Sequence, residues 1–180
     1  TGTLRLYNRN GGSSFQIGSI TGGSHTSLSG ADSSSTLTTY TIGALSTSTT
    51  FGGRFTNGGQ GATAITKTGN GTLTLSGNST HSGTTLINQG SLELLGSASA
   101  SAFQIAAGAK LSGTGTIGSS LTTATGGIIS PGAADGNSAG TLTVGSLQLN
   151  SSTLTFDLSS NPTAGNDRIT ITNNGSATFS

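Results

Sequence analysis

The chain of 180 residues contains 30 Ser, 33 Thr and 31 Gly, just over half of the total, with only 11 charged residues and no Cys, Met or Trp. The abundance of Gly and β-branched Thr argues against a helical bundle, and the absence of Cys excludes a disulfide scaffold and cysteine-ligated metals. A net charge of +1 without a Lys/Arg cluster excludes a basic nucleic-acid-binding surface.

Short segments in which apolar and polar residues alternate recur along the whole chain. Such alternation predicts β-strands, because successive side chains of a strand point to opposite faces. In chain order, the predicted strands are 4–6, 15–17, 40–42, 73–75, 92–94, 103–105, 142–144, 147–149, 154–158 and 169–171. No stretch of useful length has helical periodicity, so the predicted fold class is all-β.

Clusters of Gly and Asn separate these segments and supply residues that accept positive φ in tight turns. They lie at 11–12, 22–23, 52–53, 57–59, 70–71, 126–127 and 173–175. The longest apolar run is four residues or fewer, so we expect no membrane insertion by this segment. The chain begins at Thr1 without a basic or apolar leader, which we interpret as an internal or processed start.

A five-residue pattern, Gly-[Thr/Ser]-Leu-x-[Leu/Val], repeats within the sequence. It starts at Gly2, Gly71, Gly90, Gly140 and Gly145. The step from Gly71 to Gly90 fits one turn of a parallel solenoid, in which stacked coils share an interior.

An antiparallel sandwich would have similarly short strands. Its core normally holds larger residues than a chain with 4% aromatics supplies, so a narrow-cored β-helix is favoured. We therefore predict one parallel β-helix domain over 1–180. With about 20 residues per coil, it would have roughly nine coils and a length on the order of 40 Å.

The clearest repeat unit is segment 65–94, which reads ITKTGNGTLTLSGNSTHSGTTLINQGSLEL. It resembles the autotransporter-associated β-strand repeat, with His81 where that family prefers Tyr and Leu94 where it prefers Val. Neither change breaks the alternation. The resemblance implies a right-handed parallel β-helix on the outside of a bacterial envelope. It implies no activity, because functions in this family lie in inserted loops or separate domains.

Two later segments resemble elements that commonly accompany such repeats. One is 129–132 followed by 139–144, and the other is 166–171. The resemblance thus covers about 65–172, and segment 1–64 is similar only in style. Strand pattern continues close to both ends of the chain. We expect either an excerpt of a longer solenoid or a subunit that stacks on neighbouring copies through open β-edges.

The titratable residues show no spacing that indicates catalysis. His25 and His81 are far apart in the sequence, and the default interpretation of each is a surface histidine. Glu93 and Asp157 occupy the polar position of alternating segments and are expected to face solvent. A paired acid/base role would need their carboxyl groups about 5–10 Å apart, and nothing in the sequence places them so.

Three further motifs have ordinary structural interpretations. The acidic turns 135–137 and 166–167 lack the several oxygen ligands of a calcium site, so Asx turns are expected. The segment 113–118 echoes a dinucleotide fingerprint without the following helix. The Thr-x-Thr motifs that recur from 66–68 to 170–172 suggest an ice-binding face, but their intervals follow no single register.

These observations favour a non-catalytic structural stalk of a bacterial cell-surface adhesin of the autotransporter type. The alternative is a self-assembling subunit of an extracellular filament or sheath. We expect no catalytic, cofactor-binding or metal-binding residues and an extracellular location. The expected partners are neighbouring coils or further copies of the chain, with contacts to the cell surface or to glycans, and not nucleic acid.

Overall fold

Parallel β-strands make up the regular structure in this computed structural model, which describes residues 4–9, 12–133, 138–161, 165–172 and 175–180. No helix occurs in these ranges, and so none there could cross a membrane. The pairings between the named strands are parallel throughout. The chain is therefore a parallel β-helix, as predicted. Its right-handed winding stays a prediction, favoured by the general chirality of parallel crossovers.

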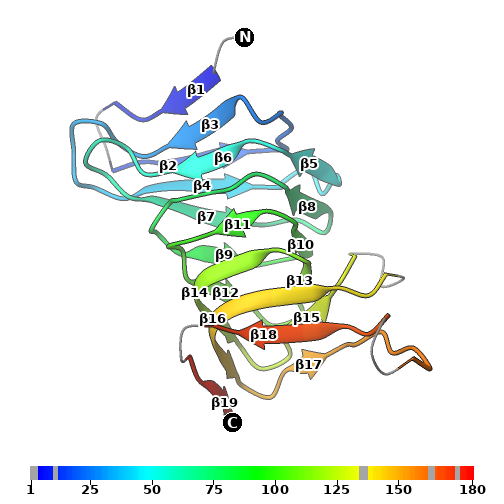
Figure 1. Cartoon of the computed structure of the whole chain (residues 1–180). Helices are drawn as coiled ribbons and strands as arrows, with labels where there is room; N and C mark the ends of the chain where they lie inside the picture. The colour runs from blue at the N-terminus through cyan, green and yellow to red at the C-terminus, as the bar shows by residue number, and fades with distance from the viewer. Residues whose placement is uncertain (1–3, 10–11, 134–137, 162–164, 173–174) are drawn as a thin grey trace.

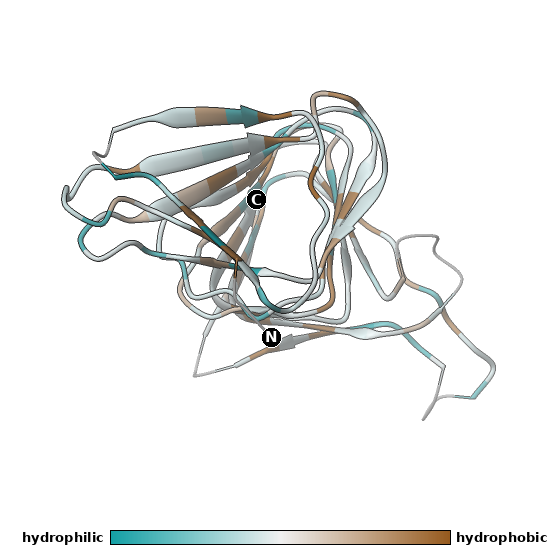
Figure 2. Cartoon of the chain, turned by 90° about the horizontal axis from the view of Figure 1, so that it is seen from above, coloured by the Kyte–Doolittle hydropathy of each residue, from teal (hydrophilic) through white to brown (hydrophobic). Residues whose placement is uncertain are grey.

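The strands stack into three faces, which run the length of the rod (Figure 1). Face I contains β1 (Leu4–Tyr7), β3 (Thr26–Ser29), β6 (Arg54–Thr56), β11 (Ser97–Ala98), the first halves of β14 (Thr116–Thr123) and β16 (Thr141–Leu149), and β18 (Arg168–Ile171). Face II contains β2 (Ser14–Ile17), β4 (Thr38–Ile42), β7 (Thr63–Lys67), β9 (Thr85–Ile87), β12 (Phe103–Ile105), the second halves of β14 and β16, and β19 (Ala177–Phe179). Face III contains β5 (Thr49–Phe51), β8 (Thr72–Leu75), β10 (Ser91–Leu94), β13 (Lys110–Gly113), β15 (Ile128–Pro131) and β17 (Thr153–Leu154). Figure 2, seen from above, shows the faces around a common interior.

The coils differ in length along the rod. In the middle the steps are equal and short, because Leu73 pairs with Leu92 and Leu92 with Leu111. Nearer the ends the steps are several residues longer, as where Tyr40 pairs with Ile65 and Leu142 with Ile169. Because loops lengthen these coils, Face II has eight levels rather than the roughly nine expected. Seven spacings of about 4.8 Å give a rod of about 34 Å.

The interior is filled by columns of inward-pointing side chains that stack from coil to coil. Face III supplies an aliphatic column of Leu73, Leu92, Leu111 and Ile129, each 2% exposed or less. The first coils hold aromatic rings instead, in the order Phe15, Tyr40, Phe55 and Phe51, with centroids 5.6, 6.3 and 5.2 Å apart, and Phe15 at the end of the stack is 38% exposed.

Glycine is required at one corner of the rod for a reason other than turn geometry. Gly53, Gly77, Gly96 and Gly115 lie one above another between Face III and Face I. A Cβ atom on any of the last three would collide with the carbonyl oxygen of the glycine one coil earlier. This glycine column lets the backbones of successive coils approach closely. Positive φ, the role predicted for the glycine clusters, is found at Gly12 and Gly126 but not at 22–23, 52–53, 57–59 or 70–71.

The observed strands β3, β5, β6, β7, β9, β11, β13, β14 and β15 were not predicted, and two predictions differ from the strands observed. Segments 142–144 and 147–149 belong to one strand, β16, which turns the corner from Face I to Face II near Gly145. The predicted strand 154–158 was wrong beyond Leu154. There the backbone N–H of Asp157 donates to the Asp167 carboxylate at 2.9 Å instead of to a neighbouring strand, and Leu158 is 79% exposed.

Candidate functional site

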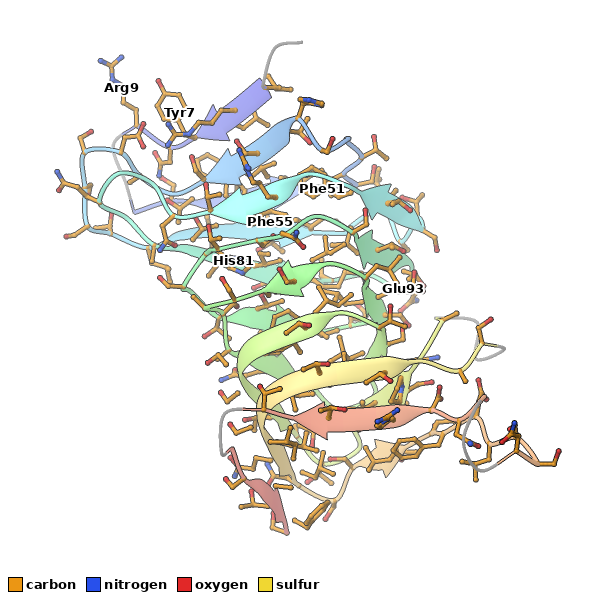
Figure 3. The ribbon with its side chains drawn as sticks, in the orientation of Figure 1. Tyr7, Arg9, Phe51, Phe55, His81 and Glu93 are labelled. Carbon is orange, nitrogen blue, oxygen red and sulfur yellow. The ribbon has the colours of Figure 1, made fainter. Side chains whose placement is uncertain are left out.

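The two histidines have opposite surroundings. His25 is exposed, as expected, and its Nδ1 atom lies 3.4 Å from the hydroxyl of Ser24. The expectation that His81 lies on the surface was wrong, because only 1% of it is exposed. It occupies the family's Tyr position, and its ring packs edge-on against Phe55 with centroids 6.0 Å apart (Figure 3). A ring at this position extends the aromatic stack of the first coils toward the middle of the rod.

His81 belongs to a buried chain of polar groups at the corner between Face I and Face II. Its Nε2 atom lies 3.0 Å from the hydroxyl of Thr85, which lies 2.9 Å from the hydroxyl of Ser101. The Ser101 hydroxyl donates to the carbonyl of Gly83 at 2.7 Å. These contacts link three side chains of two coils. Each is 1% exposed or less, so no substrate can reach them.

Burial sets the protonation state of His81. Removal from water lowers the pKa of His81 to about 4, and the backbone of Phe55 offsets part of that effect. Its Nδ1 atom is buried and has no hydrogen-bond partner among the described residues. The imidazole is therefore neutral at physiological pH and acts as a core side chain with one polar contact, not as an acid or base for catalysis.

Lys67 is the second buried titratable residue, at 1% exposure, and sequence reasoning missed it. Its stem lies in an interior column between Ile42 and Ile87. Its ammonium donates to the carbonyl oxygens of Thr68, Gly69 and Gln89 at 2.8, 2.7 and 3.0 Å. Burial lowers the pKa of the Lys67 amine. The period-two pattern could have found this residue, since Lys67 follows Ile65 by two.

Glu93 and Asp157 lie too far apart to act as an acid/base pair. Glu93 is on β10 and accepts a hydrogen bond from Thr74 at 2.8 Å. Asp157 follows β17, three levels further along Face III. Three spacings of about 4.8 Å separate these levels by about 14 Å, beyond the range of a carboxylate pair. Both residues are half-buried, so neither is the fully solvated side chain that was expected.

Asp167 has a structural role that the sequence did not reveal. Its carboxylate accepts from the backbone N–H of Gly140 at 2.7 Å and from that of Asp157 at 2.9 Å, and the residue is 9% exposed. It thus fastens the segment that leaves β17 to the start of β16. The acidic turn 135–137 lies outside the described residues. Within the described part of the chain, no group of three or more His, Asp or Glu residues could hold a metal ion.

The remaining motifs are accounted for by strands. Segment 113–118 joins β13 to β14 and is followed by more strand, not by a helix. The Thr-x-Thr pairs lie on different faces, and not all of their residues point outward. Thr72 and Thr74 lie on Face III and Thr170 on Face I, whereas Thr123 is fully buried. A continuous outward ladder does exist on Face II, but Gln and Leu interrupt its Thr residues.

The comparisons with known proteins agree with the geometry of the central coils. No curated protein matches the chain. Residues 65–94 match the family model of the passenger-associated-transport-repeat, which is the resemblance that the sequence suggested. Such a repeat is a mark of autotransporter-type passenger regions and thus of a secreted or cell-surface protein. The matched segment, which contains Lys67, His81 and Glu93, spans parts of two successive coils of the parallel β-helix.

Proposed function

We propose that the chain is a non-catalytic β-helical stalk in the passenger of a bacterial surface adhesin. The observation that carries this proposal is the stacking of the passenger-associated-transport-repeat in register with its neighbours. Leu73, Leu92 and Leu111 follow one another at equal steps and form one aliphatic column of the interior. The buried titratable groups, His81 and Lys67, make hydrogen bonds within the coil stack and are each 1% exposed.

Removal of one whole coil tests the stalk. Deletion of residues 74–92 joins Leu73 to Glu93, which occupies the place of Thr74 in the register. In a passive stalk this loss shortens the rod by about 4.8 Å and leaves the other coils folded. The full-length protein carrying the deletion should still reach the cell surface, as measured by protease accessibility and antibody labelling of intact cells. Loss of surface display by a folded variant would overturn the proposal.

A deletion that is one residue shorter provides the control. Removal of 74–91 joins Leu73 to Leu92 and shifts the strand by one residue, so that Glu93 points inward and both leucines around it change faces. This variant should lose its β-sheet circular dichroism and its surface display. If the two deletions behave alike, the coil register does not matter and the stalk interpretation fails.

The alternative, an end-to-end filament, has an observation of its own. At one end of the rod, among the described strands, β1 pairs only with β3 and β2 only with β4, and Leu4 and Leu6 are more than half exposed. At the other end Phe179 is 72% exposed. Open edges with apolar side chains recruit further strands. The substitution Leu6→Lys should abolish sedimenting oligomers, whereas Leu37→Lys, at a residue that is 50% exposed and outside the strands, should not.

A further inference from the structure

The outward surface of Face II is free of charge. It carries a ladder of outward side chains in register across eight levels, here called the Face II ladder. Its members are Gln16, Thr41, Thr66, Leu86, Gln104, Thr122, Gln148 and Thr178. Among the described residues on the strands of this face, Lys67 alone is charged, and its side chain is buried. Arg5 and Arg54 lie on Face I, and Glu93 and Lys110 on Face III.

A shallow groove of about 330 Å³ lies along the ladder, with a predominantly apolar lining. Leu86, Ala106 and Ala124 form part of its floor, and Gln104 and Thr122 supply polar groups. The amide of Asn150 also lines the groove, but it donates to the carbonyl of Thr123 and accepts from the hydroxyl of Ser180. The side chains of Gln104 and Gln148 are exposed and make no hydrogen bond to the described part of the chain. The free amide of Gln104 therefore lies in the groove beside a small apolar surface, and the free amide of Gln148 lies two levels further along the ladder.

We infer that the Face II ladder binds an extended neutral polysaccharide along the axis of the rod. A sugar chain presents apolar C–H faces and hydroxyl edges, which match the alanines and leucine of the groove and the amides beside it. The lack of charge disfavours polyanions, because no cation on this face would neutralise them. The backbone N–H and C=O groups of Face II are paired between coils, so a peptide cannot add to this face as a strand.

The size of the surface argues against a second copy as its occupant. Seven spacings of about 4.8 Å and a width of three residues give roughly 340 Å² on each copy. Two copies would bury about 700 Å², below the roughly 1,200 Å² of a stable interface. A polymer gains instead from many weak contacts, since one chain can engage successive levels of the ladder. This ligand goes beyond the stalk role, which needs none, and the test below does not depend on surface display.

The test is cosedimentation of the purified chain with microcrystalline cellulose, and retention on heparin–agarose as the charged comparison. The wild type should bind cellulose in about 0.5 M salt, where charges are screened beyond about 4 Å, and should pass through heparin. The double variant Gln104→Glu/Gln148→Glu adds charge to exposed positions and should reduce the bound fraction at least fivefold. The matched control Gln60→Glu changes an exposed loop residue and should bind like the wild type.

Several outcomes would overturn the inference. They are no binding by the wild type, equal loss in the Gln60→Glu control, or stronger retention on heparin than on cellulose. Inhibition of ice growth without cellulose binding would assign the face to ice instead. Loss of a dimer in sedimentation velocity, caused by the double variant alone, would assign it to a second copy.

Discussion

The ammonium of Lys67 donates a hydrogen bond to the carbonyl oxygen of Gln89, one coil further along the chain, at 3.0 Å. The same group also satisfies the carbonyls of Thr68 and Gly69 in its own coil. One side chain thereby closes the corner between Face II and Face III across two levels. Buried carbonyl groups without partners are costly, so this lysine stabilises the fold although its charge is removed from water.

Replacement of Lys67 with Met keeps the stem in the interior column and removes the ammonium. Three carbonyl groups then lose their partner, and the desolvation of the charge is relieved. Because the lost hydrogen bonds outweigh that relief, the free energy of unfolding should fall by about 2 kcal/mol. Urea denaturation followed by circular dichroism measures the change. Arg54→Met, at an exposed position, should change the free energy of unfolding by less than about 0.5 kcal/mol. A free energy of unfolding that is the same in Lys67→Met as in the wild type would contradict the assigned role.

The buried imidazole of His81 makes stability depend on pH. Its folded-state pKa of about 4 lies below the unfolded value of 6.5, so the unfolded chain takes up the proton first as the pH falls. Stability due to this group is complete above pH 6.5 and declines by about 3 kcal/mol between pH 6.5 and 4. His81→Tyr, the residue that the family prefers, should flatten this decline. His25→Tyr should leave it intact, and thermal melts across this pH range distinguish the two.

The glycine column predicts a large difference between two Gly→Ala substitutions. In Gly77→Ala the new methyl group would meet the carbonyl of Gly53, and the backbones of two coils would have to separate. We expect a loss of about 3 kcal/mol or more, as for other overpacked interiors. Gly23→Ala has open space around the new atom and should change stability by less than about 1 kcal/mol. Equal melting temperatures for both variants would be incompatible with the column.

Asp167→Asn tests the carboxylate that fastens the segment after β17. Both oxygens of Asp167 accept backbone N–H groups, those of Gly140 and Asp157. An amide has one acceptor fewer, so one of these N–H groups loses its partner at a cost of about 1–3 kcal/mol. Hydrogen exchange at Asp157 should accelerate, while the amides of β10 should remain protected. Unchanged exchange at Asp157 would show that another group holds this segment.

The sequence predicted those parts of the fold that depend on local alternation. The register of Leu73 with Leu92 follows from the step between Gly71 and Gly90, because each coil repeats the same inward positions. The lengths of the outer coils could not be predicted, since loops leave no periodic signal between Tyr40 and Ile65. The burial of His81 was missed because turn segments carry no alternation, and its position was judged by residue type alone.

The candidate surface on Face II was also invisible in the sequence. The Thr-x-Thr intervals vary because the coil lengths vary, and only the register of the strands shows which residues share a face. Gln104, Thr122 and Gln148 follow one another directly in the ladder, although the second interval in the sequence is much longer than the first. A binding surface on such a rod is a property of coil geometry, and residue spacing alone does not encode it.

The direction of the backbone hydrogen bonds in this rod determines how it would respond to tension. Bonds between coils run along the long axis, so a pull on its ends loads a few at a time and peels the chain away turn by turn. In the middle of the rod each turn would release about 19 residues, which is the sequence separation of Thr74 and Glu93. At about 3.5 Å per residue, every event would add about 65 Å of slack. A tether built in this way unfolds one coil at a time, so that a sudden load is absorbed in many small steps.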